Sequence, residues 1–396
     1  MMNYRTIPDT GDRVSALGYG CMRFPRKGAV IDQERTRKQV LYAIKRGVNY
    51  FDTAYLYPGS EKTLGNILAQ SGLRKKVKIA SKLPHMLIKN RADMQTIFQK
   101  QLDDLQTDYI DYYLIHNIAN WADWQRMKDL GIISFIEELR KQRRIIYFGF
   151  SFHGNIQTFR RLIDDYPWDF CQIQYNYLDE NFQAGTQGLH YAAEKGLGII
   201  VMEPLRGGIL GEKIPPGAEK LLRRASPDRS PAEWALRWLL SHPQISVVLS
   251  GMGVEAHIKE NIRVASSKGG FELSPRELAC LKRVKSVFAK KIKVPCTGCA
   301  YCLPCPFNVD IPGCFALYNA QSAYGGLTPV FHYINSTEGV FNGTPSRASN
   351  CKNCGICVKN CPQQIDIPEE LKQVARKMEK PYLRIPARFF MKLMSR

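Results

Sequence analysis

The sequence predicts an α/β protein, with a (β/α)8 TIM barrel followed by a smaller, mainly helical, cysteine-rich domain. Short apolar runs alternate with amphipathic stretches about eight times through the first 265 residues, which favours a closed barrel. No Gly-x-Gly-x-x-Gly fingerprint follows the first apolar run, which disfavours a doubly wound nucleotide-binding sheet. Nine of the twelve cysteines fall between Cys296 and Cys361, which sets the C-terminal part apart.

The eight expected strands are short apolar runs, each followed by a stretch of helical periodicity. They are expected at 16–20, 48–52, 77–81, 112–115, 145–150, 171–174, 198–202 and 246–249. The clearest helices are expected at 32–46, 61–71, 91–105 and 231–240, the last with a proline in its first turn. A small hairpin turning at 9–12 precedes the barrel, and a basic helix at 274–293 follows it. We therefore expect a barrel domain at 1–290 and a second domain at 291–396.

The composition excludes several classes of protein. Hydrophobic residues make up 44% of the 396 and charged residues 23%, which allows a large buried core. About 290 residues carry almost no cysteine, so a disulfide-stapled secreted protein is excluded. No run approaches the roughly 18 apolar residues of a membrane span, and the N-terminus lacks the apolar region of a signal peptide. We expect a soluble, cytoplasmic protein.

The net charge of +20 points to an acidic partner without identifying one. The basic tail after Cys361 has four cations spaced four apart, which would line one face of a helix: Arg384, Arg388, Lys392 and Arg396. A solvated helix end, a docking face for an acidic electron-carrier protein and contact with an anionic membrane surface all remain open. Nucleic acid is not expected, because the chain has no recognised binding motif.

Eight cysteines form two arrays whose spacing predicts iron–sulfur ligation. The second array matches the bacterial ferredoxin run at every spacing and ends in Cys-Pro: Cys351, Cys354, Cys357 and Cys361. The first array also ends in Cys-Pro but has one residue fewer before its fourth cysteine: Cys296, Cys299, Cys302 and Cys305. Two such arrays fit two [4Fe–4S] clusters, and a pair of four-cysteine zinc sites is the alternative.

The fourth cysteine of each run ligates the other cluster in two-cluster ferredoxins. We therefore expect Cys305 to join the second array and Cys361 to join the first. Cys314 belongs to neither array and is expected to be a buried thiol, with a role as ligand left open.

Polar side chains stand at the ends of three consecutive expected strands: Asp52, Lys82 and His116. Tyr57 follows Asp52 by five residues. Because the carboxyl ends of barrel strands meet at one face, we expect these four side chains to lie together and to form an active site.

This constellation resembles the aldo-keto reductase family over residues 1–290. The resemblance is carried by stretch 47–54 with Tyr57 and Glu61, by 80–82 and by 111–116. With the cysteine arrays added, the whole chain resembles the branch of that family bearing a C-terminal ferredoxin-type domain. The resemblance implies that Asp52, Tyr57, Lys82 and His116 are the catalytic set.

The residue types suit reduction of a carbonyl or oxidation of an alcohol. Tyr57 would be the acid/base, and because tyrosine normally has a pKa of about 10, it needs help at neutral pH. A neighbouring Lys82 ammonium would lower that pKa, and Asp52 would hold the ammonium in place. His116 would position the carbonyl oxygen or share the proton transfer.

The resemblance also implies a nicotinamide cofactor, held by residues on strand six and after strands five, seven and eight. The implied set is Ser151, His153, Gln172, Met202, Pro204, Leu205, Gly207, Ser250, Gly251, Met252, Glu260 and Asn261. Gly251 and His257 stand where the family has cations for the 2′-phosphate of NADPH, so no preference for NADPH is predicted. NADH and a flavin are the alternatives.

Two further points remain open at the level of sequence. Hydride transfer moves two electrons together and a cluster moves one, so coupling them needs two clusters in sequence or a flavin. The barrel is alternatively a redox-sensing or regulatory module with structural clusters and no turnover. Trp121 and Trp124, in an expected loop at 119–128, could stack on a small-molecule substrate or simply pack beneath that loop.

Overall fold

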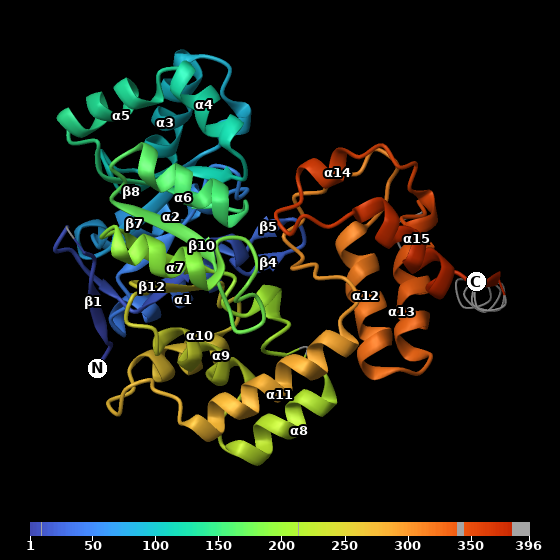
Figure 1. The fold of residues 1–396 in the computed structure, drawn as a ribbon. Helices are drawn as coiled ribbons and strands as arrows, with labels where there is room; N and C mark the ends of the chain where they lie inside the picture. Colours follow the sequence, from blue (N-terminus) through green and yellow to red (C-terminus); the bar gives the residue numbers. More distant parts are fainter. Residues whose placement is uncertain (9, 213, 339–343, 382–396) are drawn as a thin grey trace. The chain divides into compact units, whose positions relative to one another are not determined.

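The computed structural model describes the chain except residues 9, 213, 339–343 and 382–396 (Figure 1). The chain divides into two compact units. The first unit comprises 1–205 and 232–274, and the second comprises 206–231 and 275–396. The four regularly spaced cations of the tail lie outside the described residues. No helix in the described part of the chain is long and apolar enough to span a bilayer.

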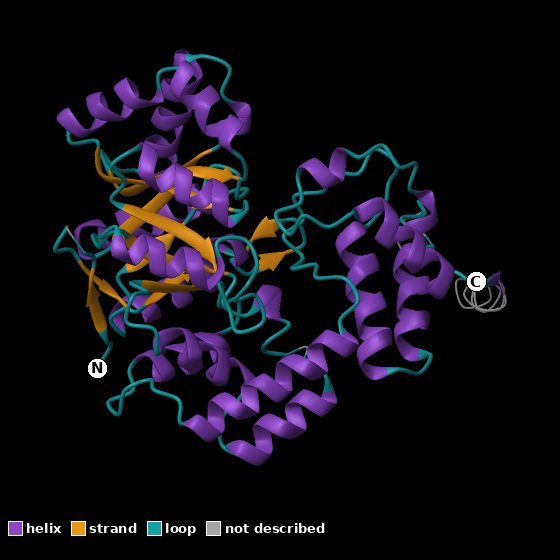
Figure 2. Ribbon diagram, viewed as in Figure 1, coloured by secondary structure: helices purple, strands orange, loops and turns teal. Residues whose placement is uncertain are grey.

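The first unit contains the predicted barrel, which closes through eight parallel strands (Figure 2). In barrel order from the first strand they are β3 (Leu17–Gly20), β6 (Tyr50–Asp52), β7 (Lys78–Leu83), β8 (Ile110–Ile118), β9 (Ile145–Phe152), β10 (Phe170–Gln174), β11 (Gly198–Met202) and β12 (Val247–Ser250). β12 pairs with β3 through Val248 and Leu17, which closes the barrel. All eight strands lie where the sequence predicts them.

Helices alternate with the strands, as expected for this fold. They are α1 (Gln33–Lys45), α2 (Ser60–Ser71), α3 (Arg91–Leu105), α5 (Ile132–Lys141), α6 (Ile156–Asp165), α7 (Gly185–Glu194), α9 (Pro231–Leu240) and α10 (Glu255–Ala265). Asn90 and Asp93 form a reciprocal capping box that begins α3. Two short antiparallel strands, β1 (Tyr4–Thr6) and β2 (Arg13–Ser15), precede the barrel, and a second small hairpin pairs β4 (Arg26–Lys27) with β5 (Val30–Ile31).

The barrel interior is filled by large side chains. Tyr112 packs against two other rings, with its ring centroid 5.1 Å from that of Tyr50 and 5.1 Å from that of Phe170. Ile7 and Val14, from the N-terminal hairpin, are completely buried in the same cluster. The interior is therefore a packed core, and polar chemistry is left to the strand ends.

The expected loop at 119–128 is wrong, because the structure forms helix α4 (Trp121–Asp129) there. The side chain of Asn120 accepts a hydrogen bond from the Asp123 amide and begins the helix. Trp124 is fully buried, donates to Asp165 at 2.7 Å and packs on Trp168. Trp124 is therefore a packing residue.

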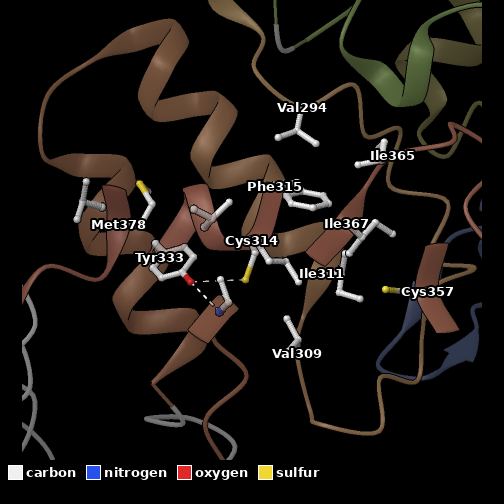
Figure 3. Close-up of a cluster of buried hydrophobic side chains, with 14 of the residues drawn as sticks. Val294, Val309, Ile311, Cys314, Phe315, Tyr333, Cys357, Ile365, Ile367 and Met378 are labelled. Carbon is white, nitrogen blue, oxygen red and sulfur yellow. Dashed lines mark hydrogen bonds between the residues drawn. The ribbon is translucent and has the colours of Figure 1, made fainter. Parts of the chain in front are cut away.

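The second unit is mainly helical, as predicted. Its helices are α8 (Pro216–Ala225), α11 (Pro275–Lys291), α12 (Ile311–Tyr324), α13 (Thr328–Thr337), α14 (Ile356–Lys359) and α15 (Ile367–Met378). Its hydrophobic core is built from α12, α13 and α15 together with residues that flank the arrays (Figure 3). The cysteines of the two arrays lie in loops around this core, apart from Cys357 in the one-turn α14.

Candidate active site and cysteine arrays

The ends of strands β6 and β7 hold a buried ion pair. The Lys82 ammonium donates to both carboxylate oxygens of Asp52 and to the backbone oxygen of Thr53, each at 2.7 Å. Lys82 is 1% exposed and Asp52 3% exposed. Burying two charges is costly unless they are paired and hydrogen-bonded, and here all three ammonium protons have an acceptor. The position of Lys82 is therefore fixed by the protein alone.

Tyr57 and His116 lie beside this pair. The Lys82 Nζ atom is 4.9 Å from the centroid of the Tyr57 ring. The His116 ring lies edge-on to Tyr57, with 5.9 Å between centroids and 86° between planes. The structure thus brings together Asp52, Tyr57, Lys82 and His116, the set implied by the resemblance.

Burial shapes the electrostatics of this cluster. It raises the pKa of the Asp52 carboxyl, and the Lys82 ammonium opposes that rise. It lowers the pKa of His116 well below its usual range, and the charges of Lys82 and of nearby His153 and His85 lower it further. His116 is therefore a neutral imidazole at neutral pH.

A buried polar network behind Lys82 was not anticipated as a unit from the sequence. Gln101 donates to Glu61 and to the Ser81 hydroxyl, each at 2.8 Å, and to the Lys82 backbone oxygen at 3.1 Å. Tyr113 donates to Gln101 at 2.9 Å, and Ser81 also donates to Glu61. The network joins α2, α3, β7 and β8, so it holds the backbone that carries Lys82. A buried glutamine on an otherwise apolar helix face was the only local signal.

Asn117, directly after His116, is a second residue that sequence reasoning missed. Its backbone is left-handed, with φ +63°, and the register of β8 shifts between Ile115 and Ile118. Its backbone amide donates to the Ser151 hydroxyl at 2.7 Å, and its backbone oxygen lies 3.3 Å from His85 Nε2. Because asparagine tolerates this conformation, it was the available signal for a bend at the strand end.

Gln172 on β10 carries an acceptor that fits a carboxamide. Its Nε2 atom lies 3.6 Å from the Met202 sulfur. Its Oε1 atom is buried and has no hydrogen-bond partner among the residues described. An unpartnered buried oxygen is costly, and a donor from a bound molecule would satisfy it. Gln172 and Met202 therefore fit the nicotinamide end of the implied cofactor.

Ser151 and His153, two other residues implied to bind the cofactor, lie at the end of β9. The Ser151 hydroxyl accepts from Asn117, and Ser151 is 1% exposed. His153 is 8% exposed, and burial lowers its pKa to about 4. Its backbone amide donates to Ile118 at 2.9 Å, which joins the ends of β8 and β9.

The end of β12 is linked to helix α10 by two other implied residues. Asn261 donates to the Ser250 hydroxyl at 3.0 Å, and both are buried. Met252 is buried, and its backbone oxygen accepts from Tyr19 at 3.3 Å. Glu260 is half-buried. A Cβ on Gly251 would lie 3.0 Å from Cδ of Arg23, so the arginine stem passes along this loop.

The segment after β11 is divided between the two units. Pro204 and Leu205 belong to the barrel unit, whereas Gly207 belongs to the second unit. A Cβ on Gly207 would lie 2.0 Å from the backbone oxygen of Thr297, the residue after Cys296. The structure therefore places Gly207 against the first cysteine array.

The fourth cysteine of each array lies near thiols of the other array. Burial raises the pKa of Cys302 to about 12, and the neighbouring thiols that add to this rise are Cys299, Cys296 and Cys361. The thiols that act on Cys357 in the same way are Cys351, Cys354 and Cys305. This grouping brings Cys361 to the first array and Cys305 to the second.

Within the described ranges, no three His, Cys, Asp or Glu side chains converge closely enough to hold one metal ion. The Asn353 amide donates to the Cys351 sulfur at 3.4 Å, the type of bond that tunes cluster potentials.

Cys314 lies in the core of the second unit (Figure 3). It is completely buried, and its sulfur lies 3.7 Å from the Tyr333 hydroxyl. That hydroxyl accepts from the Ala348 amide at 3.0 Å and donates to Glu379 at 2.6 Å. Burial raises the pKa of Cys314 to about 12. Cys314 is therefore a packing thiol beside a network that fixes the approach to Cys351.

The fold and the buried Lys82–Asp52 pair beside Tyr57 define a barrel oxidoreductase. Residues 16–284 match the sequence profile of the aldo/keto reductase family, and residues 295–365 match that of the 4Fe-4S dicluster domain. The chain belongs to the aldo/keto reductase family and carries a C-terminal 4Fe-4S dicluster domain.

Named relatives agree with this assignment. L-galactose dehydrogenase of Arabidopsis thaliana is 26% identical over 280 residues, which cover 65% of this chain and 86% of that protein. The protein tas of Escherichia coli is 26% identical over 351 residues, covering 72% of this chain and 99% of that protein. The solved holo structure of an aldo-keto reductase from Bacillus halodurans superimposes with a TM-score of 0.59 at 25% identity, covering 72% of this chain and 96% of that chain.

Proposed function

We propose that the barrel interconverts a carbonyl and an alcohol at Tyr57, and that two [4Fe–4S] clusters in the second unit exchange electrons with it and with a partner. One observation supports the proposal most strongly. The Lys82 ammonium is held by three hydrogen bonds of 2.7 Å within 4.9 Å of the Tyr57 ring. A fixed cation at that distance stabilises a phenolate in a water-poor site.

In the reducing direction, Tyr57 donates its hydroxyl proton to the oxygen that becomes negative as the carbonyl is reduced. The Lys82 ammonium stabilises the phenolate left behind, and Asp52 and Thr53 keep the ammonium in place. Neutral His116 donates a hydrogen bond to the same oxygen and thereby orients the carbonyl. In the oxidising direction the Tyr57 phenolate accepts the proton of the alcohol.

A bound nicotinamide would supply or accept the hydride. Gln172 would accept a hydrogen bond from its carboxamide at Oε1, and Met202 would cover the ring. Ser250, Gly251 and Met252, with Glu260 and Asn261, would hold the adenosine half. Gly251 and His257 provide no permanent charge for a 2′-phosphate, so we propose that NADH is bound at least as well as NADPH. A flavin is the alternative cofactor.

The cysteine grouping supports two clusters, one held by Cys296, Cys299, Cys302 and Cys361 and the other by Cys351, Cys354, Cys357 and Cys305. One carbonyl reduction consumes two electrons and two protons, so two one-electron transfers from a partner supply one turnover. Thiolate arrays of this kind persist in a reducing compartment, and we therefore place the protein in the cytoplasm.

Anaerobic purification followed by iron, sulfide, zinc and flavin analysis tests the composition. We expect about eight irons and eight sulfides per chain, which follows from two four-iron clusters. Four irons, or zinc in their place, contradicts the proposed pair of clusters.

The electron link is tested by adding NADH to the oxidised protein and recording the visible absorbance of the clusters. We expect the absorbance to bleach, because oxidation of one NADH releases two electrons, one for each cluster, and one proton to solvent. If the clusters stay oxidised while the protein turns over a carbonyl, their role is structural. No turnover with any carbonyl, together with fully loaded clusters, supports a redox-sensing module instead.

A further inference from the structure

The net charge of +20 is distributed unevenly between the two units. The second unit carries 24 Lys and Arg against 10 Asp and Glu, whereas the barrel unit carries 32 against 26. The smaller unit therefore holds most of the excess positive charge. Such a field attracts acidic macromolecules and raises their association rate.

Within that unit, one array cysteine reaches the surface. The structure describes all twelve cysteines, and Cys354 is the only one classed as exposed. It lies in the turn between Cys351 and α14, and residues 352–354 and 358–360 are all exposed. A cluster held by Cys354 would therefore lie close to solvent at this turn.

The side chains around Cys354 have the composition of a protein interface. Lys352 and Lys359 are exposed on either side of it. Ile356 is 50% exposed and Val358 37% exposed, an unusual degree for apolar side chains on so short a segment. An apolar centre with a charged rim is typical of a transient protein contact.

No carboxylate lies in the sequence from 344 to 365. The nearest are Asp366 and Glu369, which begin helix α15. Glu369 is paired with Lys372 at 2.9 Å on that helix. The turn around Cys354 thus presents two cations without an acidic residue of its own segment.

We propose that the exposed turn 352–359 is the docking surface for an acidic one-electron carrier protein. The proposal rests on the proposed function, in which Cys354 ligates a cluster. Lys352 and Lys359 attract the carrier, and Ile356 and Val358 form the dry centre of the contact. In each encounter the reduced carrier loses one electron and the nearby cluster gains one, with no bond formed or broken.

Equilibrium binding of a purified, oxidised flavodoxin, an acidic one-electron carrier, tests the surface without turnover. The full-length, cluster-loaded protein is titrated anaerobically, and the fluorescence of the flavodoxin flavin reports binding. The Lys352→Glu/Lys359→Glu double variant should bind about tenfold more weakly at low salt, and the difference should shrink as salt is added.

The matched control is Lys282→Glu/Lys290→Glu, which makes the same change of charge at two exposed positions of α11. It should weaken binding less than threefold, because it alters only the long-range field. Ile356→Gln should weaken binding with little change in salt dependence.

Equal weakening by both double variants overturns the proposal, and so does an absence of flavodoxin binding by the loaded wild-type protein. The proposal is also overturned if the Lys352→Glu/Lys359→Glu variant loses binding to vesicles rich in phosphatidylserine but binds flavodoxin as the wild-type protein does. That result assigns the surface to a membrane. Iron and sulfide are measured on the same sample. A chain without clusters contradicts the proposed function, whereas a loaded chain that ignores the charge reversal contradicts the docking surface alone.

Discussion

The two units organise their reactive groups in different ways. In the barrel, Lys82 and Asp52 stand on paired strands, and bonds within the protein determine their geometry. In the second unit seven of the eight array cysteines stand in loops, and a buried core beneath those loops positions them. The barrel site is therefore formed by the scaffold itself, whereas the arrays depend on their supports and on the clusters that they bind.

The largest effect is expected where the barrel holds a charge rigidly. Lys82→Met removes the ammonium and leaves the Asp52 carboxylate buried and unpaired. We expect a loss of turnover on the order of 1,000-fold and about 3–5 kcal/mol of stability. Asp52→Asn combined with Lys82→Met should restore stability without turnover, as judged by chemical unfolding and steady-state kinetics. Lys78→Met, which removes a partly exposed pair with Asp12, is the control. Turnover retained by Lys82→Met would contradict the role of the ammonium.

The next largest effect is expected at Gly207, which packs against the segment of the first cysteine array. Gly207 has φ +65°, and an added Cβ would lie 2.0 Å from the Thr297 backbone oxygen. Gly207→Ala should displace the segment that carries Cys296 and reduce the bound iron by about half, because each cluster holds four irons. Gly208→Ala is a matched control, since Gly208 has φ +94° and open space around it. Equal iron loss in both variants would show that backbone strain alone is responsible.

Acid should destabilise the barrel through its buried histidines. Burial lowers the pKa of His153 to about 4, whereas in the unfolded chain it is about 6.5. Between these values the unfolded chain binds more protons, so the free energy of unfolding falls as pH is lowered, by up to about 1.4 kcal/mol per pH unit for this group. In the His153→Asn variant the free energy of unfolding should therefore fall less steeply as the pH is lowered. Tryptophan fluorescence is a clean probe, since all five tryptophans belong to the barrel unit. Identical pH dependence of both proteins would refute the assignment.

The smallest effect is expected at Gln172, which is proposed to bind the nicotinamide carboxamide. Gln172→Met keeps the size of the side chain but removes the unpartnered Oε1 acceptor. Loss of one hydrogen bond should weaken binding of NADH about tenfold, equivalent to about 1.4 kcal/mol. Equilibrium titration of nicotinamide fluorescence measures this, and an unchanged dissociation constant would place the carboxamide elsewhere.

The parts of the site that sequence analysis predicted are those with local signals. Asp52, Lys82 and His116 each end a short apolar run. The alternation of strands and helices predicts a barrel, and in a barrel the ends of these strands meet at one face. The network of Gln101 and Tyr113 has no such signal, because its members come from a helix and a strand that meet only in the fold.

Other differences have specific physical causes. The side chain of Asn120 caps the first turn of α4, so a helix forms where a loop was expected. Gly207 lies against Thr297, an approach between distant segments that no local pattern encodes. The strands of the barrel could all be predicted, because short apolar runs alternate with stretches of helical periodicity through the first 265 residues.

Proton exchange by Tyr57 beside a fixed ammonium is the step on which the proposed reaction depends. It is tested most directly by the steady-state rate at which Tyr57→Phe reduces 4-nitrobenzaldehyde with NADH or NADPH, compared with the wild-type protein. Iron content and tryptophan fluorescence serve as controls for the two units. We predict a fall in kcat of at least about 1,000-fold with both controls unchanged. A kcat equal to that of the wild-type protein would contradict the account.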